Sequence, residues 1–285
     1  MSETKPAPGA AVSGEGALSG RLVARDLTTG YEGRTIIEGM DITVPDGKVS
    51  VIIGGNGCGK STLLKTLARL IHPKGGQVLV DGRAIHEIPT KKLAQELGLL
   101  PQSSLTPDGI RVCDLVARGR FPYQSFMRGL QPSDYEAVHE AMELMGVSEL
   151  SDRPVDALSG GQRQRVWIAM ALAQQTDILL LDEPTTYLDI AYQVEILDLL
   201  ADLNRSRGTT IVMVLHDINL SARYADHLFA LRQGTLIREG APRDVVTAEL
   251  MREVFDLDCV VIDDPVAGTP MIVPKGRFRP ELGRA

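Results

Sequence analysis

Short runs of apolar residues along the chain predict the strands of a buried sheet. Val49–Ile53 and Ile178–Leu181 are almost wholly apolar, and Ile211–Leu215 repeats the pattern. Apolar and polar residues alternate instead in Leu22–Leu27 and Met40–Val44, which predicts an antiparallel layer ahead of that sheet. Two further strands are expected at Gln77–Val80 and Leu97–Leu100.

Helical periodicity fills several segments between these strands. Val194–Leu203 has its isoleucine and leucine residues on one stripe, which is typical of a helix packed on a core. From about residue 103 to 157 the pattern is helical, most clearly in Tyr135–Met145, and this stretch is expected to be a helical insertion. The part beyond Gly240 is expected to contain one short helix and two strands, at Thr247–Phe255, Val260–Ile262 and Pro270–Val273.

A glycine-rich segment follows the first apolar run and opens a helical pattern. Gly54–Ser61 matches G-x-x-x-x-G-K-[ST]. In such a loop the backbone N–H groups point at a phosphate, Lys60 reaches the β- and γ-phosphates, and the Ser61 hydroxyl can ligate Mg²⁺. The alternative is a structural turn, but the strand-then-helix context favours ATP or GTP as the ligand. The residues expected to contact the nucleotide are Gly54, Asn56, Gly57, Cys58, Gly59, Lys60, Ser61 and Thr62.

Two adjacent carboxylates follow the strand Ile178–Leu181. The carboxyl end of a parallel strand would place Asp182 and Glu183 beside the phosphate loop. Carboxylates there are costly unless a cation or a proton transfer uses them. Asp182 fits a contact to Mg²⁺ through water, and Glu183 fits a general base that orients the attacking water. An acidic turn that caps the next helix is the alternative, and the phosphate loop weakens it.

The chain has a second glycine-rich segment, Leu158–Gln162. One nucleotide normally needs only one such phosphate-binding segment, so the second points to a second copy of the chain. With the preceding motifs, this segment makes residues 22–240 resemble the nucleotide-binding subunit of an ATP-binding cassette (ABC) transporter. The resemblance implies that this segment of one subunit closes on the γ-phosphate held by Lys60 of another. An ordinary helix cap with a capping box is the alternative, and it is compatible with that role. The residues concerned are Ser159, Gly160, Gly161 and Gln162.

Four single residues match the same family in the expected order. Gln102 matches the glutamine that touches Mg²⁺ and the lytic water, and Asp189 matches the loop that crosses the dimer interface. His216 matches the histidine that contacts the γ-phosphate. Tyr31 stands where an aromatic residue stacks on adenine, with a packed core tyrosine as the alternative. The resemblance thus implies catalysis by Glu183, His216 and Gln102, and a metal site at Ser61, Gln102 and Asp182.

The resemblance also implies the fold and its division into domains. The expected class is α/β, a P-loop NTPase with a RecA-like core, an antiparallel β-subdomain and an inserted α-helical subdomain. Residues 21–240 are expected to form the ATPase domain, with the helical insertion at about 103–157, and residues 241–285 a C-terminal extension. Residues 1–20 are rich in Gly, Ala, Ser and Pro, and we expect them to form a disordered tail.

Composition agrees with this assignment and limits the partners. The 285 residues are 44% hydrophobic, enough for one large core with an insertion or for two small domains. A net charge of −7 argues against broad nucleic-acid binding. Three cysteines without metal spacing suggest a reduced compartment, and Cys58 in the loop is a candidate for alkylation that blocks nucleotide binding. No stretch is long and apolar enough to span a bilayer, and the N-terminus lacks a signal-peptide pattern.

The implied partners are a second ATPase subunit, two membrane-spanning permease subunits and, through them, a periplasmic or lipid-anchored substrate-binding protein. The chain would then lie on the cytoplasmic face of the cell membrane, with ATP and Mg²⁺ bound. Val116–Tyr123, Trp167–Met170 and Thr185–Asp189 resemble stretches of importers of iron-siderophores, heme and cobalamin. Ferric siderophore is the expected cargo, with cobalamin or heme as alternatives.

Two other functions stay open on the sequence. A soluble ABC ATPase of DNA repair or translation would usually carry a long coiled coil or a second cassette, and neither is evident here. An interaction module with negligible turnover would not need Glu183 and His216.

Overall fold

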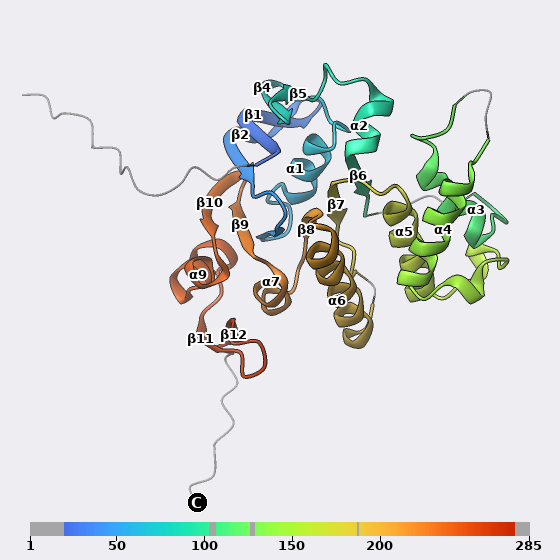
Figure 1. Ribbon diagram of the computed structural model, residues 1–285. Helices are drawn as coiled ribbons and strands as arrows, with labels where there is room; N and C mark the ends of the chain where they lie inside the picture. Colours follow the sequence, from blue (N-terminus) through green and yellow to red (C-terminus); the bar gives the residue numbers. More distant parts are fainter. Residues whose placement is uncertain (1–19, 103–106, 126–128, 187, 277–285) are drawn as a thin grey trace, which may run out of the picture.

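A six-stranded, mainly parallel sheet forms the centre of the protein (Figure 1). The computed structural model describes residues 20–102, 107–125, 129–186 and 188–276. The strands β6, β7, β8, β3 and β9 run parallel, and β10 pairs antiparallel with β9. In spatial order they are β10 (Thr235–Gly240), β9 (His227–Arg232), β3 (Val49–Gly54), β8 (Thr210–Val214), β7 (Ile178–Asp182) and β6 (Leu97–Leu100).

Both faces of this sheet are covered, which explains the nearly continuous apolar runs in its strands. Every residue of β3, β7 and β8 is buried. Alternate residues of each strand point to opposite faces: Val51 and Ile53 pack in one hydrophobic cluster, and Ile52 packs in the other. The expected α/β class is confirmed.

A four-stranded antiparallel sheet and the helix α1 cover one face of the central sheet. Together they supply Leu22, Leu27 and Leu63 to the second cluster. The β9–β10 turn presses on this layer so closely that a Cβ at Gly234, where φ is 79°, would overlap the carbonyl oxygen of Ile36. The elements of this layer are β1 (Leu22–Tyr31), β2 (Arg34–Val44), β4 (Gly75–Val80), β5 (Arg83–Ala84) and α1 (Lys60–Leu67).

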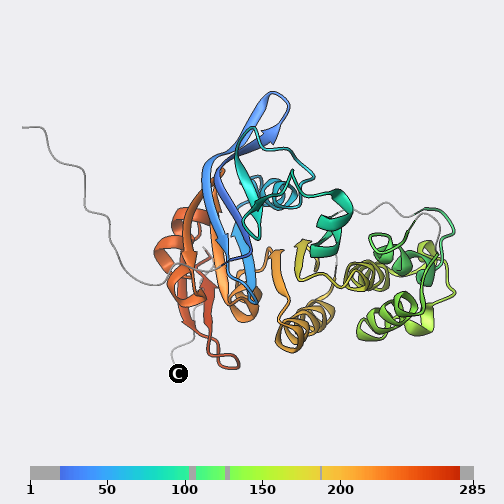
Figure 2. The ribbon, with the colours of Figure 1, turned by 45° about the horizontal axis from the view of Figure 1, so that its top comes forward.

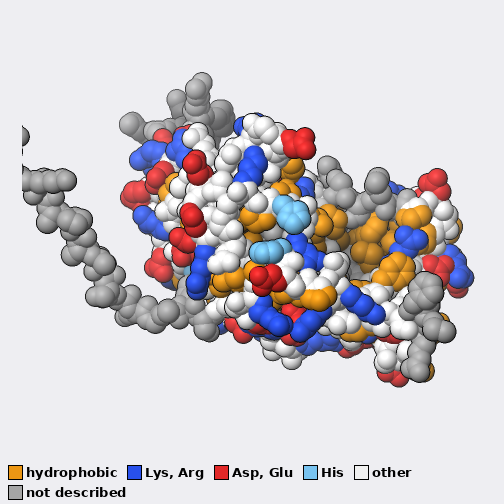
Figure 3. Space-filling model, turned by 90° about the horizontal axis from the view of Figure 1, so that it is seen from above, with side chains coloured by type: hydrophobic (Ala, Val, Ile, Leu, Met, Phe, Trp, Pro, Cys, Tyr) orange, Lys and Arg blue, Asp and Glu red, His pale blue; other side chains and the backbone are white. Residues whose placement is uncertain are grey.

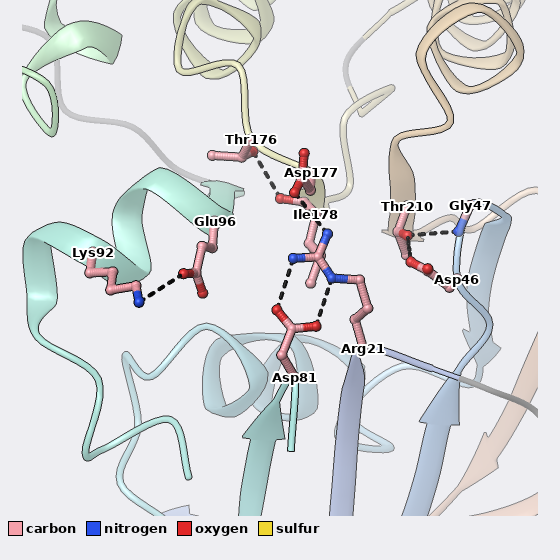
Figure 4. A network of polar contacts seen from close by, with 10 residues as sticks. All are labelled: Arg21, Asp46, Gly47, Asp81, Lys92, Glu96, Thr176, Asp177, Ile178 and Thr210. Carbon is pink, nitrogen blue, oxygen red and sulfur yellow. Dashed lines mark hydrogen bonds and ion pairs between the residues drawn. The ribbon is translucent and has the colours of Figure 1, made fainter. Parts of the chain in front are cut away.

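A polar network joins the antiparallel layer to the central sheet (Figure 4). The Arg21 guanidinium donates to both carboxylate oxygens of Asp81, at 2.7 and 2.9 Å, and to Asp177 at 2.8 Å. Asp177 directly precedes β7, so one side chain connects the start of β1, the end of β4 and the start of a core strand. The hydroxyl of Thr210, at the start of β8, receives a hydrogen bond from the N–H of Gly47 and donates one to Asp46.

A helical segment, made of residues 107–125 and 129–173, lies at one end of the central sheet. It is at the far end of the molecule from the C-terminal elements (Figure 2). Its centre is a buried ion pair in which Nε of Arg120 lies 2.8 Å from Asp134, with both side chains at most 6% exposed. Arg120 also donates to the carbonyl oxygen of Ala173. The elements from β5 to β7 are α2 (Thr90–Glu96), α3 (Val112–Ala117), α4 (Pro132–Leu144) and α5 (Gly160–Ala173), with 3-10 turns η1 (Arg118–Arg120), η2 (Ser148–Leu150) and η3 (Val155–Ala157).

The second face of the central sheet packs against helices from the second half of the chain. Leu197 and Leu200 of these helices lie in the same hydrophobic cluster as Val51 and Ile53 of β3, so the apolar stripe expected in Val194–Leu203 faces the core. The C-terminal hairpin packs against α7. The elements are α6 (Ile190–Arg207), α7 (Ile218–Tyr224), α8 (Pro242–Val245), α9 (Ala248–Phe255), β11 (Cys259–Asp263) and β12 (Pro270–Pro274).

Several expectations fall partly outside the described residues. They concern the N-terminal tail apart from Gly20, residues 103–106 and 126–128 of the helical insertion, Tyr187, and the chain beyond residue 276.

Across the described ranges, none of the helices is both long and apolar enough to cross a membrane. Charges of both signs are mixed on the face seen in Figure 3.

Candidate functional site

The glycine-rich loop connects β3 to α1 at the carboxyl edge of the central sheet. Gly57 and Gly59 have φ angles of 74° and 108°, values that suit glycine and turn the backbone inward. The Lys60 side chain is buried, and its Nζ donates to the carbonyl oxygens of Gly54 at 2.8 Å and Gly55 at 3.0 Å. A buried ammonium held by two carbonyl oxygens, with no carboxylate partner among the described residues, is suited to receive an anion.

A cavity of about 500 Å³ opens beside this loop. Glu183 and His216, which follow the neighbouring strands β7 and β8, line it together with the loop. The loop residues in its wall are Asn56, Gly57, Gly59, Lys60, Ser61 and Thr62. The rest of the wall was not expected from the sequence and consists of Arg34, Thr35, Ile36, Gln233 and Gly234. These residues come from β2 and the β9–β10 turn, and no local motif marks them.

The burial of Cys58 contradicts the expectation that its thiol is a candidate for alkylation. Its side chain is 6% exposed and packs in the hydrophobic cluster beneath the loop, so close to Gly54 that a Cβ there would lie 2.7 Å from Sγ. The thiol therefore faces the core, and it is a poor target for alkylation. Its contribution to the loop is packing under Gly54.

Ser61 and Asp182 form the part of the site that fits Mg²⁺. The Ser61 hydroxyl donates to Oδ1 of Asp182 at 2.8 Å. Oδ2 of Asp182 is buried and has no hydrogen-bond partner among the residues that the structure describes. Burial raises the pKa of Asp182, an effect that the hydrogen bond from Ser61 reduces. An unsatisfied buried carboxylate oxygen beside a hydroxyl is a donor set that a hard cation, or its bound water, would complete.

Glu183 is held by three side chains from three segments. His216 Nε2 lies 2.8 Å from its Oε1, while Gln102 Nε2 and the Thr186 hydroxyl donate to its Oε2 at 2.7 and 3.0 Å. Burial alone would raise the pKa of Glu183, but the hydrogen bonds from His216, Thr186 and Gln102 hold it below its usual value. Glu183 also has a φ of 56°, a conformation that is strained for a side-chain-bearing residue and that is often found at functional sites.

Thr186 was not foreseen as a site residue. The only sequence signal for it is the spacing Glu183-Pro-Thr-Thr186, which puts a hydroxyl three residues after the carboxylate. A turn brings the two together, because the N–H of Thr186 donates to the Glu183 carbonyl oxygen at 3.3 Å.

The Leu158–Gln162 segment leads into α5, with Leu158 buried and the residues after it nearer the surface. The N–H of Gln162 donates to the Ser159 hydroxyl at 3.3 Å, and the N–H of Ser159 donates to the Gln162 side chain at 3.1 Å, so the expected capping box is formed. Ser159 and Gly160 are exposed. Gly160 lines a separate cavity with Gln102 and Trp167, and within the described residues no part of this segment lines the cavity of Lys60.

Neither Asp189 nor Tyr31 lines the cavity. Asp189 caps α6 by accepting a hydrogen bond from the N–H of Tyr192 at 3.2 Å. Tyr31 ends β1, pairs with Arg34 of the cavity wall, and is 50% exposed, which excludes a packed core role.

Comparisons with known proteins agree with this geometry. The sequence matches the ABC transporter family over residues 37–186. It is 52% identical over 265 residues to the ferric enterobactin transport ATP-binding protein FepC of Escherichia coli strain K12, covering 93% of this chain and 98% of that protein. It is 53% identical over 253 residues to the probable siderophore transport system ATP-binding protein YusV of Bacillus subtilis strain 168, covering 89% and 92%.

Solved structures share the fold. A metal-chelate type ABC transporter in an inward-facing conformation superposes with a TM-score of 0.78 at 28% identity, over 91% of this chain and 99% of that one. The dimeric bacterial ABC transporter cassette MJ0796 superposes with a TM-score of 0.69 at 27% identity, over 77% and 98%. The family match covers half of the chain, and the two relatives cover nearly all of it. The chain therefore belongs to the ABC transporter ATP-binding family.

Proposed function

We propose that this protein is the ATP-hydrolysing subunit of an importer of ferric siderophores, acting as a homodimer on the cytoplasmic face of the cell membrane. The observation that carries the proposal is the joint presence of Lys60, Ser61, Glu183 and His216 in the wall of one cavity. Several relatives are named for ferric enterobactin, achromobactin and iron(3+)-hydroxamate transport, which supports this cargo over cobalamin or heme.

ATP would enter the cavity with its phosphates against the loop. Lys60 then exchanges two carbonyl oxygens for the β- and γ-phosphates, so a buried charge gains a charged partner. Tyr31, exposed at the end of β1, is placed to stack on adenine. Ser61, Asp182 and the amide oxygen of Gln102 would hold Mg²⁺, which when bound neutralises charge on the phosphates.

Glu183 would orient and deprotonate the attacking water. Because hydrogen bonds hold its pKa below the usual range, it is a carboxylate at neutral pH and accepts a hydrogen bond from water. His216 is 47% exposed and lines the cavity, so it can reach the γ-phosphate while it contacts Glu183. Gln102 donates to the same carboxylate and precedes the helical segment, so it connects the reacting centre to that segment.

The second half of each site would come from another copy. Ser159 and Gly160 lie exposed at the N-terminus of α5, where N–H groups and the helix dipole favour an anion. Since this segment does not line its own chain's cavity, a second copy must present it to the γ-phosphate. Closure then follows ATP binding because the closed dimer contacts the γ-phosphate more fully than the open one.

The helical segment would meet the permease subunits. Phe121 and Tyr135 are 60% and 61% exposed on it, and hydrophobic side chains gather at this end of the molecule (Figure 3). Exposed apolar area of this kind is typical of protein interfaces. The permeases, and a substrate-binding protein beyond them, would select the cargo.

Replacement of Glu183 by Gln tests the catalytic assignment. We expect Glu183→Gln to bind ATP as the wild type does, to hydrolyse it at least about a hundredfold more slowly because the base is lost, and to elute as an ATP-dependent dimer in gel filtration. Glu249→Gln, an exposed change on α9, is the matched control. Wild-type phosphate release by Glu183→Gln, or a monomer with ATP, would contradict the assignment.

The cargo is tested in proteoliposomes that contain the co-purified permease and this ATPase. We expect ATP inside the vesicles to drive uptake of a radio-iron-loaded siderophore delivered with its binding protein, and no uptake of cobalamin or heme. Uptake of either alternative without uptake of ferric siderophore would replace the proposed cargo and leave the ATPase assignment intact.

A further inference from the structure

The helix α7 begins at Ile218, two residues after His216. Its N-terminal cap is Asp217, which accepts a hydrogen bond from the N–H of Leu220 at 2.8 Å. On the other side of His216, Leu215 is buried beyond the end of β8. The backbone of His216 is therefore fixed between a core strand and α7.

The side chain of His216 has little else to hold it. It is 47% exposed, and among the described residues its polar contact is the one with Glu183. The place of the imidazole thus depends on the position of α7. With seven residues, α7 is too short to be stable without tertiary contacts.

The C-terminal hairpin β11–β12 supplies two such contacts to α7. Asn219 pairs with the backbone of β12: its Oδ1 accepts from the N–H of Ile272 at 2.8 Å, and its Nδ2 donates to the Ile272 carbonyl oxygen at 3.3 Å. One turn later, Arg223 donates from Nε and Nη2 to Oδ2 of Asp264, at 3.0 and 2.6 Å. Figure 1 shows the hairpin beside α7.

Asp264 is built into the hairpin to receive Arg223. Its side chain is 4% exposed, and its Oδ1 accepts the N–H groups of Val266 at 2.9 Å and Ala267 at 3.3 Å. The same residue makes two backbone hydrogen bonds across the turn, with Thr269 and Gly268. A carboxylate fixed in this way holds the guanidinium in one geometry.

We propose that the C-terminal hairpin positions His216 for ATP hydrolysis, and that Asn219, Arg223 and Asp264 are the positioning residues. The inference rests on the proposed function of His216. No hairpin residue lines the cavity, and β12 packs against α7, so the hairpin's route to His216 runs through this helix. Because transition-state contacts are sensitive to displacements of about 1 Å, a loosened α7 lowers the rate of hydrolysis before it changes ATP binding.

Two neighbouring aspartates of the hairpin allow a matched experiment. Asp264→Asn removes the charge that holds α7, whereas Asp263→Asn makes the same change one residue earlier, where the partner is Arg243 of α8. With the purified full-length protein, we expect Asp264→Asn to lower kcat for ATP about tenfold, with unchanged ATP affinity. Asp263→Asn should keep both values.

A cycle with His216→Ala separates positioning from general loosening. If Asp264 acts through His216, Asp264→Asn should lower kcat no further in the His216→Ala background, measured by single turnover with labelled ATP. An equal loss in both backgrounds, or wild-type kcat for Asp264→Asn, would overturn the inference. Should Asp264→Asn fail to fold, Asn219→Ala takes its place in the same cycle. Absence of hydrolysis by the wild type would instead refute the proposed function.

Discussion

Two adjacent carboxylates in the site are set for different tasks by their surroundings. Burial raises the pKa of Asp182, whose second oxygen has no partner in the described part of the chain, whereas three hydrogen bonds hold the pKa of Glu183 down. The oxygens of Asp182 therefore suit a cation, and the carboxylate of Glu183 suits an attacking water. Thr186 contributes to this difference because its hydroxyl donates a hydrogen bond to Glu183.

Thr186 is therefore expected to matter for the rate. Thr186→Val keeps the shape but removes the hydroxyl, and we expect kcat for ATP to fall about tenfold because a hydrogen bond to a charged group contributes roughly 1.5–3 kcal/mol. Thr186→Ser keeps the hydroxyl and should retain most of the rate. Steady-state phosphate release with a separate measurement of ATP affinity checks this, and equal rates for the Val and Ser variants would contradict it.

At the scale of elements, polar side chains join segments that apolar packing alone does not align. Arg120 and Asp134 connect η1 to α4 inside the helical segment, with both side chains buried. Arg21 connects the antiparallel layer to β7 at the surface, with side-chain exposures of 29% for Arg21 and 43% for Asp81. Loss of the Arg120–Asp134 pair should lower the free energy of unfolding more than loss of the Arg21–Asp81 pair, because a buried charge that loses its partner stays uncompensated.

Arg120→Ala should be strongly destabilising. It leaves Asp134 buried without its cation, and we expect the free energy of unfolding to fall by about 3 kcal/mol. The control is Arg111→Ala, which breaks a half-exposed pair with Asp114 and should lower the free energy of unfolding far less, because water already screens that pair. Urea unfolding followed by circular dichroism measures both, and a similar small loss for the two variants would refute the difference.

The Arg21 joint predicts a pH dependence of stability. Hydrogen bonds from Arg21 lower the pKa of Asp81 from its ordinary 3.8 in the folded protein. A lowered folded pKa gives stability that is complete above 3.8 and is lost as the pH falls through the folded pKa. Arg21→Gln should cost at most about 1 kcal/mol at pH 7, given the exposure of the pair, and less at pH 3. Urea unfolding at both values checks the trend, which a larger deficit at pH 3 would contradict.

At the scale of the whole molecule, the two glycine-rich segments line separate cavities of one chain. The loop with Lys60 and the segment with Ser159 could act on one phosphate only if two copies meet. The resemblance to a dimeric cassette supports that arrangement. The helical segment and the C-terminal hairpin lie at opposite ends, so permease contact and positioning of His216 need not compete for surface.

Mixing two inactive variants tests the shared site. Lys60→Ala and Ser159→Arg should each abolish hydrolysis as homodimers. A mixed dimer would hold one site with both defects and one intact site, so an equal mixture should regain roughly a quarter of wild-type activity if exchange is free. The control is either variant mixed with itself. Failure of the mixture to regain activity, with mixed dimers verified by tagged pull-down, would contradict shared sites.

The sequence by itself determined the local devices. A strand, a glycine-rich turn and a helix in direct succession were sufficient to expect the phosphate loop, and the spacing of Ser159 and Gln162 was sufficient to expect their capping box. These features depend on residues within a few positions of one another, where backbone geometry and hydrogen bonding are nearly independent of the rest of the chain. The apolar runs likewise predicted buried strands correctly.

Only the tertiary structure decided which distant segments share a surface. Gln233 and Arg34 line the cavity of Lys60 because β9–β10 and β2 pack together, and neither residue belongs to a motif. Cys58 turns into the core although its neighbours face the cavity. The contacts from Asp264 to Arg223, and so to the helix after His216, join residues 41 positions apart. Such contacts depend on how whole layers pack, and sequence periodicity encodes only which face of an element is apolar, not its neighbour.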